Sequence, residues 1–260
     1  WGPYDPSNQF IISGNVQQGT VVLDPVSVIV ADTVVNLSGR GSLERLEGDL
    51  LVDNLPVELA SVFYPLPVAV TGDIDITTQL TGSLANPRIE GELLVVEPAI
   101  NEQPLERVAA TFGYRNAVLE VDGGAALAPN DAPMTLRGTV PYALPFMTVR
   151  PATDQIALTA VVPDDTFDFV NVFTDEQLRW EGGDGEVVVR VRGSVFNPEI
   201  AGTATFRDGI VGSSELGNPL TNINGQVQFD LAQVRIPRLQ AQMGDGTVAV
   251  VGQLPLQLSG

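Results

Sequence analysis

A phrase that occurs twice constrains this chain more than any other feature. Residues 82–91 and 193–202 share the pattern Gly-Ser-x-x-Asn-Pro-x-Ile-x-Gly, and the second copy begins 111 positions after the first, at 193 against 82. A glycine that closes a strand, an Asn-Pro turn and an apolar residue before a final glycine are typical of two strands joined at a corner. The phrase therefore predicts a hairpin corner turning at Asn-Pro, and its return predicts an internal structural repeat.

Apolar and polar residues alternate between the corners. In residues 73–81, Ile74, Ile76 and Leu80 share one face of an extended strand, and polar side chains occupy the other. Residues 187–192 and 226–231 alternate in the same way. Runs of this kind separated by turn residues predict an all-β fold, an elongated and repetitive antiparallel sheet with one wet and one apolar face.

The two copies align over most of their length and divide the chain into three parts. We expect residues 1–52 to be the tail of a preceding repeat, 53–162 a first unit and 163–260 a second, stacked as one body. Residues 53–63 and 163–173 each predict a short helical turn. Further on, residues 108–112 align with 223–227, and residues 134–140 align with 248–254. The stretch from Pro141 to Pro151, with Tyr142, Leu144, Phe146 and Met147, predicts a packed loop between the units.

Composition argues against several classes of function. A net charge of −19 disfavours nucleic acids and anionic membrane surfaces, which would repel the chain. Cysteine and histidine are absent, which removes thiolate ligands, the commonest metal ligand and the commonest general base. The acidic group Asp164, Asp165 and Asp168 lacks the spacing of a calcium loop. We therefore expect no enzyme activity, no catalytic residue, no metal site and no cofactor.

The chain also carries no recognisable targeting or membrane-spanning segment. No apolar run reaches the roughly 18 residues that a transmembrane helix needs. The sequence starts at Trp1 without methionine, and we expect it to be a piece of a longer protein.

The collective apolar face is the most informative candidate for a binding site. It could fill the inside of a closed barrel, sandwich or solenoid, or it could line an open curved sheet. Few segments could form helices to cover the sheet and few large aromatic side chains could plug it, which favours the open form. The predicted lining residues are Ile74, Ile76, Leu80, Leu93, Val95, Phe112, Leu119, Val121, Val187, Val189, Val191, Phe206, Val227, Phe229, Leu231, Val248 and Val250.

The ordered motifs resemble the C-terminal region of TamB-like proteins, a branch of the AsmA-like envelope proteins. The resemblance is carried by residues 80–91 and their copy at 191–202, by Leu55-Pro56-Val57-Glu58-Leu59-Ala60, and by the series from Pro219 through Asn222-Ile223-Asn224-Gly225 to Gly244-Asp245-Gly246. It covers nearly the whole chain. The N-terminal membrane anchor and the extreme C-terminal segment of the family are not recognisable in this sequence.

The resemblance implies a curved, taco-shaped sheet with an apolar groove and one or two short helical turns. It further implies a periplasmic bridge, anchored in the inner membrane through a missing N-terminal segment, that conducts phospholipid between the inner and outer membranes or supports outer-membrane protein assembly. The implied partners are phospholipid acyl chains and an outer-membrane barrel of the TamA/BamA type, with no nucleic acid. The alternatives are a chaperone-like scaffold that binds unfolded barrel strands by strand addition, and an adhesin-like β-solenoid with a filled core.

Overall fold

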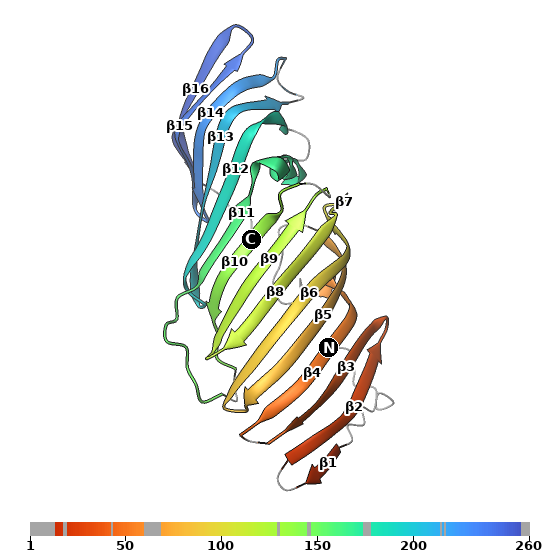
Figure 1. Cartoon of the computed structure of the whole chain (residues 1–260). Coiled ribbons are helices and arrows are strands. Elements are labelled where there is room, and N and C mark those ends of the chain that lie inside the picture. Colours follow the sequence, from red (N-terminus) through yellow and green to blue (C-terminus); the bar gives the residue numbers. More distant parts are fainter. Residues whose placement is uncertain are drawn as a thin grey trace.

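The chain forms one long antiparallel sheet. A computed structural model describes residues 14–17, 20–42, 44–59, 69–128, 131–144, 147–173, 178–213, 215 and 217–255. Each strand pairs with the next one along the chain, apart from the short β7, which pairs only with β6. The 16-stranded sheet runs as a twisted ribbon from β1 to β16 (Figure 1). The predicted all-β class with short helical turns is confirmed.

The strands follow the alternating runs of the sequence. Their bounds are β1 Gly14–Gln17, β2 Thr20–Val30, β3 Thr33–Gly41, β4 Leu46–Pro56, β5 Val70–Ser83, β6 Asn86–Ile100, β7 Gln103–Pro104, β8 Arg107–Arg115, β9 Val118–Ala126, β10 Met134–Pro141, β11 Ala157–Val162, β12 Arg179–Ser194, β13 Asn197–Gly212, β14 Leu220–Asp230, β15 Gln233–Met243 and β16 Gly246–Pro255. Among the described residues, the 3-10 segments η1 (Val57–Leu59) and η2 (Asp164–Phe173) interrupt them, and η2 has a kink at Thr166, where the backbone is not helical.

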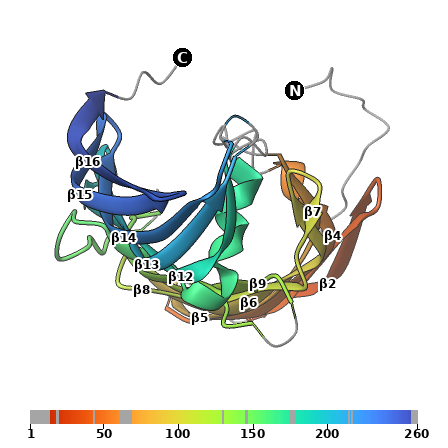
Figure 2. The same cartoon turned by 90° about the horizontal axis from the view of Figure 1, so that it is seen from above.

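The sheet curves into an open trough. Viewed from above, the strands form a U, and η2 lies inside the curve (Figure 2). Phe167 of η2 contacts Phe206 of β13, one of the predicted apolar residues. The apolar face is therefore the concave one.

The repeated phrase forms a corner in both copies, but the turn lies earlier than predicted. Leu84 and Ala85 form the first turn, and Asn86 already pairs with Ser83. The hydroxyl of Ser83 accepts a hydrogen bond from the Asn86 N–H at 3.2 Å, and Ser194 does the same for Asn197 at 3.2 Å. The serine thus closes the corner, and the Asn-Pro pair begins the next strand.

The order of elements also repeats. η1 and the strands β5, β6, β8, β9 and β10 are followed, after β11, by η2 and β12 to β16. The last glycine of each phrase fixes the alignment, since Gly91 pairs with Phe112 and Gly202 pairs with Phe229. Phe112 therefore corresponds to Phe229 and not, as the sequence alignment predicted, to Val227. The pairing of β13 with β14 has register shifts between Phe206 and Val211, whereas that of β6 with β8 has none, and these irregularities conceal the register in the sequence.

The sheet is continuous across the predicted boundary between the two units, and both predicted helical turns overlap a 3-10 segment. β11 pairs with β12 without a break in the sheet, and the boundaries at residues 52 and 162 stay predictions. η2 spans the second predicted helical turn, and η1 lies within the first. Residues 60–63 of the first turn, Phe146 and residues 1–13 lie outside the described residues. Among the helices that the structure describes, none is long and apolar enough to cross a membrane.

The segment after β10 is a packed loop, as predicted. We call its described residues, 142–144 and 147–156, the strap. The strap follows one rim of the sheet and contacts both corners, because Thr148 N–H donates to the carbonyl of Ala85 at 3.3 Å and Ile156 N–H donates to that of Gly193 at 2.7 Å. Met147 is only 4% exposed. The strap therefore ties the two repeats together along their rim.

Candidate functional site: an apolar groove

Cross-strand register brings the predicted lining residues onto one face. One row runs Thr78, Gly91, Phe112, Val121, Gly138, Leu158, Val191 and Ile200 from β5 to β13. The next row runs Ile76, Leu93, Ala110, Gly123, Leu136, Ala160, Val189, Gly202, Phe229, Val234 and Leu254. Ile74 with Val95, Leu80, Leu119, Val187, Val227, Val248 and Val250 lie in flanking positions of the same face. These rows make a nearly continuous apolar floor.

Leu231 is the exception among the predicted residues. β14 ends at Asp230, and Leu231 lies in the following turn, where it is 49% exposed. The Asp230 carboxylate accepts hydrogen bonds from the backbone N–H groups of Ala232 and Gln233, which turns the chain one residue before the alternation ends. Leu231 is therefore not on the floor of the groove.

The N-terminal part of the floor is open. A hollow of about 750 Å3 extends over β2 to β8. Ile76, Leu80 and Phe112, which the sequence predicted, contribute to its wall, as do Leu23, Leu37 and Leu50. These three leucines were not predicted. In β4 the alternation is concealed, because Leu50 is followed by Leu51. The backbone separates the two, since Leu50 pairs with Leu37 and Thr78 whereas Leu51 pairs with Asn36 and Thr77.

The C-terminal part of the floor is covered by η2. Phe167 is only 2% exposed, and its ring centroid lies 4.6 Å from that of Trp180 and 5.8 Å from that of Phe206. Both contacts have the edge-to-face geometry that aromatic pairs favour. Phe206 was predicted to line an open face, and this prediction is wrong, because a helix packs on it. The floor is therefore open over β2 to β8 and covered at Phe206, and the sheet as a whole stays open, with β1 and β16 at its two ends.

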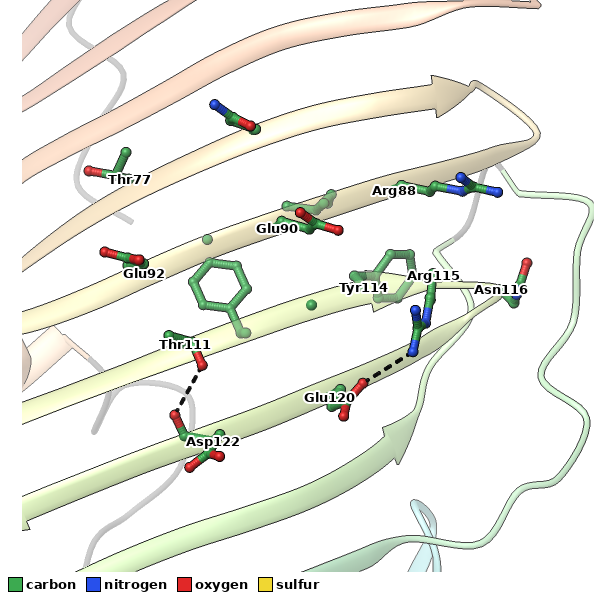
Figure 3. A pocket seen from close by; sticks show the side chains of 15 residues that line it. Thr77, Arg88, Glu90, Glu92, Thr111, Tyr114, Arg115, Asn116, Glu120 and Asp122 are labelled. Carbon is green, nitrogen blue, oxygen red and sulfur yellow. Dashed lines mark hydrogen bonds and ion pairs between the residues drawn. The ribbon is translucent and has the colours of Figure 1, made fainter. Parts of the chain in front are cut away.

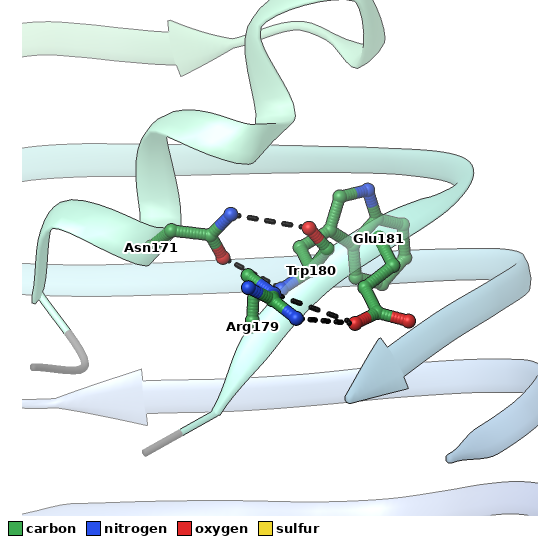
Figure 4. A network of polar contacts seen from close by, with 4 residues as sticks. All are labelled: Asn171, Arg179, Trp180 and Glu181. Atoms are coloured by element: carbon green, nitrogen blue, oxygen red, sulfur yellow. Dashed lines mark hydrogen bonds and ion pairs between the residues drawn. The ribbon is translucent and has the colours of Figure 1, made fainter. Parts of the chain in front are cut away.

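Polar contacts fix η2 in place. The side-chain amide of Asn171 donates to the carbonyl of Trp180 at 3.1 Å and accepts from the N–H of Trp180 at 2.6 Å (Figure 4). The carboxylate of Asp164 accepts from the N–H of Gly185 at 2.7 Å. Trp180 and Phe167 carry the clearest sequence signal for this contact, two large aromatics in a chain that has few.

The strap covers the rim of the groove at β8 and β9. Tyr114, Ala117 and Met147 form a buried cluster, against which Leu119 packs. The Tyr114 hydroxyl donates to the carbonyl of Tyr142 at 2.8 Å, and Leu144 N–H donates to that hydroxyl at 3.4 Å. Leu119 therefore supports the rim rather than the open floor.

The polar face carries charges of both signs. A hollow of about 1110 Å3 on β5, β6, β8 and β9 is bordered by Glu90, Glu92 and Glu120 among others (Figure 3). Glu120 lies 3.5 Å from Arg115, and Asp122 lies 2.8 Å from Arg137. Within the described residues, no group of three or more acidic side chains is placed to hold a metal ion. Exposed pairs of this kind contribute little to stability and keep the face wet.

The turn after β14 predicts a pH dependence. The N–H of Ala232 is the main cause that holds the pKa of Asp230 below its usual value. Ionised Asp230 therefore stabilises the fold above its unfolded pKa of about 4, and this contribution is lost as the pH falls through the lower folded pKa. We expect Asp230→Asn to lower the melting temperature at pH 6 and to differ less from the native chain at pH 3. Circular dichroism measures the melting temperatures. An equal difference between the variant and the native chain at pH 6 and at pH 3 would contradict this expectation.

Comparisons with known proteins leave the family open. No family model matches the chain. No solved structure matches it either. It is similar to a rice protein (Oryza sativa subsp. japonica) named Protein SUBSTANDARD STARCH GRAIN 4, chloroplastic, with 35% identity over 78 residues. That match covers 30% of this chain and 4% of the rice protein, so the chain spans a small fraction of that relative's length.

Proposed function

We propose that this chain is a segment of a bridge-like envelope protein that carries phospholipid acyl chains in its apolar groove. One observation carries the proposal, the open apolar hollow of about 750 Å3 on the concave face of the sheet. An acyl chain gains about 0.8 kcal/mol for each CH2 group that leaves water. A lined trough therefore binds such chains without any catalytic side chain.

The shape of the sheet suits a passage along its length. Strands lie about 4.8 Å apart, so the strand path from β1 to β16 extends over roughly 70 Å. Because the trough is open on one side (Figure 2), a polar headgroup can stay in water while its acyl chains lie on the floor. The charged outer face keeps the remaining surface hydrated.

The wider setting of the proposal rests on the resemblance to TamB-like proteins. In that setting the chain lies in the periplasm, between an inner-membrane anchor and an outer-membrane barrel of the TamA/BamA type. Phospholipid transfer and outer-membrane protein assembly are both activities of this setting, and the apolar floor favours the first. η2 narrows the route, because an acyl chain that passes β12 and β13 must displace or bypass Phe167.

Two neighbouring leucines allow a matched test. Leu50 faces the hollow and Leu51 faces the polar side. An acidic side chain among acyl groups costs about 2.5–3.5 kcal/mol, which is roughly a hundredfold in affinity. We expect Leu50→Asp to lose bound phospholipid, whereas Leu51→Asp retains it.

The measurement is native mass spectrometry of the chain purified from cells, with organic extraction of any bound lipid. Loading from vesicles of phosphatidylethanolamine and phosphatidylglycerol then measures binding by each variant, and circular dichroism verifies that both are folded. Equal loading of the two folded variants, or no lipid on the native chain by either route, would contradict the proposal.

A further inference from the structure

We infer that two glycine–phenylalanine pairs, Gly91 with Phe112 and Gly202 with Phe229, set the depth of the groove. This inference rests on the proposed function and names residues that determine how an acyl chain fits. Each glycine ends one copy of the repeated phrase, and each phenylalanine stands directly opposite it on the next strand. The phrase therefore encodes a feature of the floor as well as a corner.

The phenylalanine rings lie flat across the glycines. A Cβ atom added to Gly91 would lie 2.4 Å from Cζ of Phe112. A Cβ atom added to Gly202 would lie 2.1 Å from Cζ of Phe229 and 2.3 Å from its Cε2. Non-bonded carbon atoms do not approach each other this closely. Each ring therefore occupies the space that the Cβ of any other residue type would need at the glycine. In both repeats the far end of the ring reaches across the gap between two strands.

Backbone conformation does not explain these two glycines. Neither Gly91 nor Gly202 is among the residues with positive φ, unlike Gly82 and Gly193 of the same phrase. Glycine in an extended strand is otherwise unfavourable, because it loses more conformational freedom on folding than other residues. The space beneath the aromatic ring is therefore the reason for glycine that the two positions share, and at Gly91 the Thr77 carbonyl oxygen and Thr78 Cγ2, each 2.8 Å from an added Cβ, exclude a side chain as well.

The phenylalanine of the first pair borders the open hollow. Phe112 borders the hollow together with Thr78, and Gly91 lies between them in the same cross-strand row. A ring that lies flat presents its face to the trough and leaves the space above it free. A ring lifted by a side chain at position 91 would project into the hollow and compete with a long, unbranched acyl chain for that space.

The test measures binding of a fluorescent long-chain fatty acid to the whole chain. We expect Gly91→Ala to raise the Kd about tenfold, because overpacking displaces the Phe112 ring. The double variant Gly91→Ala/Phe112→Leu should recover part of the loss, with a Kd between those of the native chain and Gly91→Ala. The shorter side chain removes the contact with the ring, but the contact of the methyl group with the Thr77 carbonyl oxygen at 2.8 Å remains. The control is Gly113→Ala. Gly113 lies next to Phe112 on β8, and an added Cβ there has nothing within 4 Å, so this variant should bind as the native chain does.

A second measurement leaves position 91 unchanged. It is needed because a Cβ at Gly91 also approaches the carbonyl oxygen of Thr77 at 2.8 Å, so that Gly91→Ala disturbs the backbone as well as the ring. Phe112→Trp keeps the glycine and places a fluorophore on the floor, where brominated palmitate should quench it beyond the quenching of the parent chain. Unchanged affinity of folded Gly91→Ala, or bound palmitate that leaves the new tryptophan unquenched, would overturn the inference while the proposed groove stands. A native chain that binds no fatty acid would overturn the proposed function itself.

Discussion

Phe167→Ala is expected to destabilise the fold by about 3–5 kcal/mol, the usual range when a buried phenylalanine is truncated. The ring is 2% exposed and lies between Trp180 and the floor, where a Cβ added to Gly185 would meet its Cγ at 2.5 Å. Removing it leaves a cavity that the curved sheet cannot close, because β12 and β13 are held by their backbone pairing. Denaturant unfolding, followed by circular dichroism and tryptophan fluorescence, measures the loss.

Phe196→Ala provides the matched control for that variant. Phe196 lies in the second corner turn and is 97% exposed, so its truncation should change the stability by less than about 0.5 kcal/mol. Phe167→Ala should also uncover Phe206 and lengthen the open part of the floor, which predicts more bound fatty acid per folded chain. Similar stabilities for the two variants would mean that η2 does not depend on its phenylalanine to stay on the sheet.

Gly138→Ala is expected to cost about 3 kcal/mol or more and to separate the sheet between its two repeats. Gly138 has φ of 143°, a region that side-chain-bearing residues rarely adopt, and an added Cβ would lie 1.8 Å from the carbonyl oxygen of Ala157. Backbone strain alone accounts for about 1–3 kcal/mol. The collision is with the neighbouring backbone, so no side-chain rotation can relieve it.

The location of Gly138 should confine the loss of stability to β10 and β11. It pairs with Val121 on one side and Leu158 on the other, where β11 follows the strap. Hydrogen exchange should show the amides of β10 and β11 losing protection before those of β5 and β6. Gly252→Ala, on a strand where an added Cβ has nothing within 4 Å, should leave exchange unchanged. Uniform loss of protection along the sheet would contradict a local break.

Much of the strand pattern could be predicted from local sequence. Ile74, Ile76 and Leu80 alternate with polar residues, and this period fixes both the strand and the face that each side chain occupies. The corners at Ser83 and Ser194 follow from residues that lie next to one another. The prediction fails by two positions at Phe112, because the register shifts in the pairing of β13 with β14 depend on contacts between strands and leave no pattern in the local sequence.

The sequence by itself determined that one face of an antiparallel sheet is apolar, and that the corner and the strands that follow it occur twice. Only the tertiary structure decided which part of that face is open. Phe167 reaches Phe206, and Met147 reaches Tyr114, across long stretches of chain. These contacts depend on how the sheet curves and where a helix and a strap cross it. Alternation reports the face of a side chain but carries no information on what lies above it, so the open hollow at Leu50 and the covered floor at Phe206 look alike in the sequence.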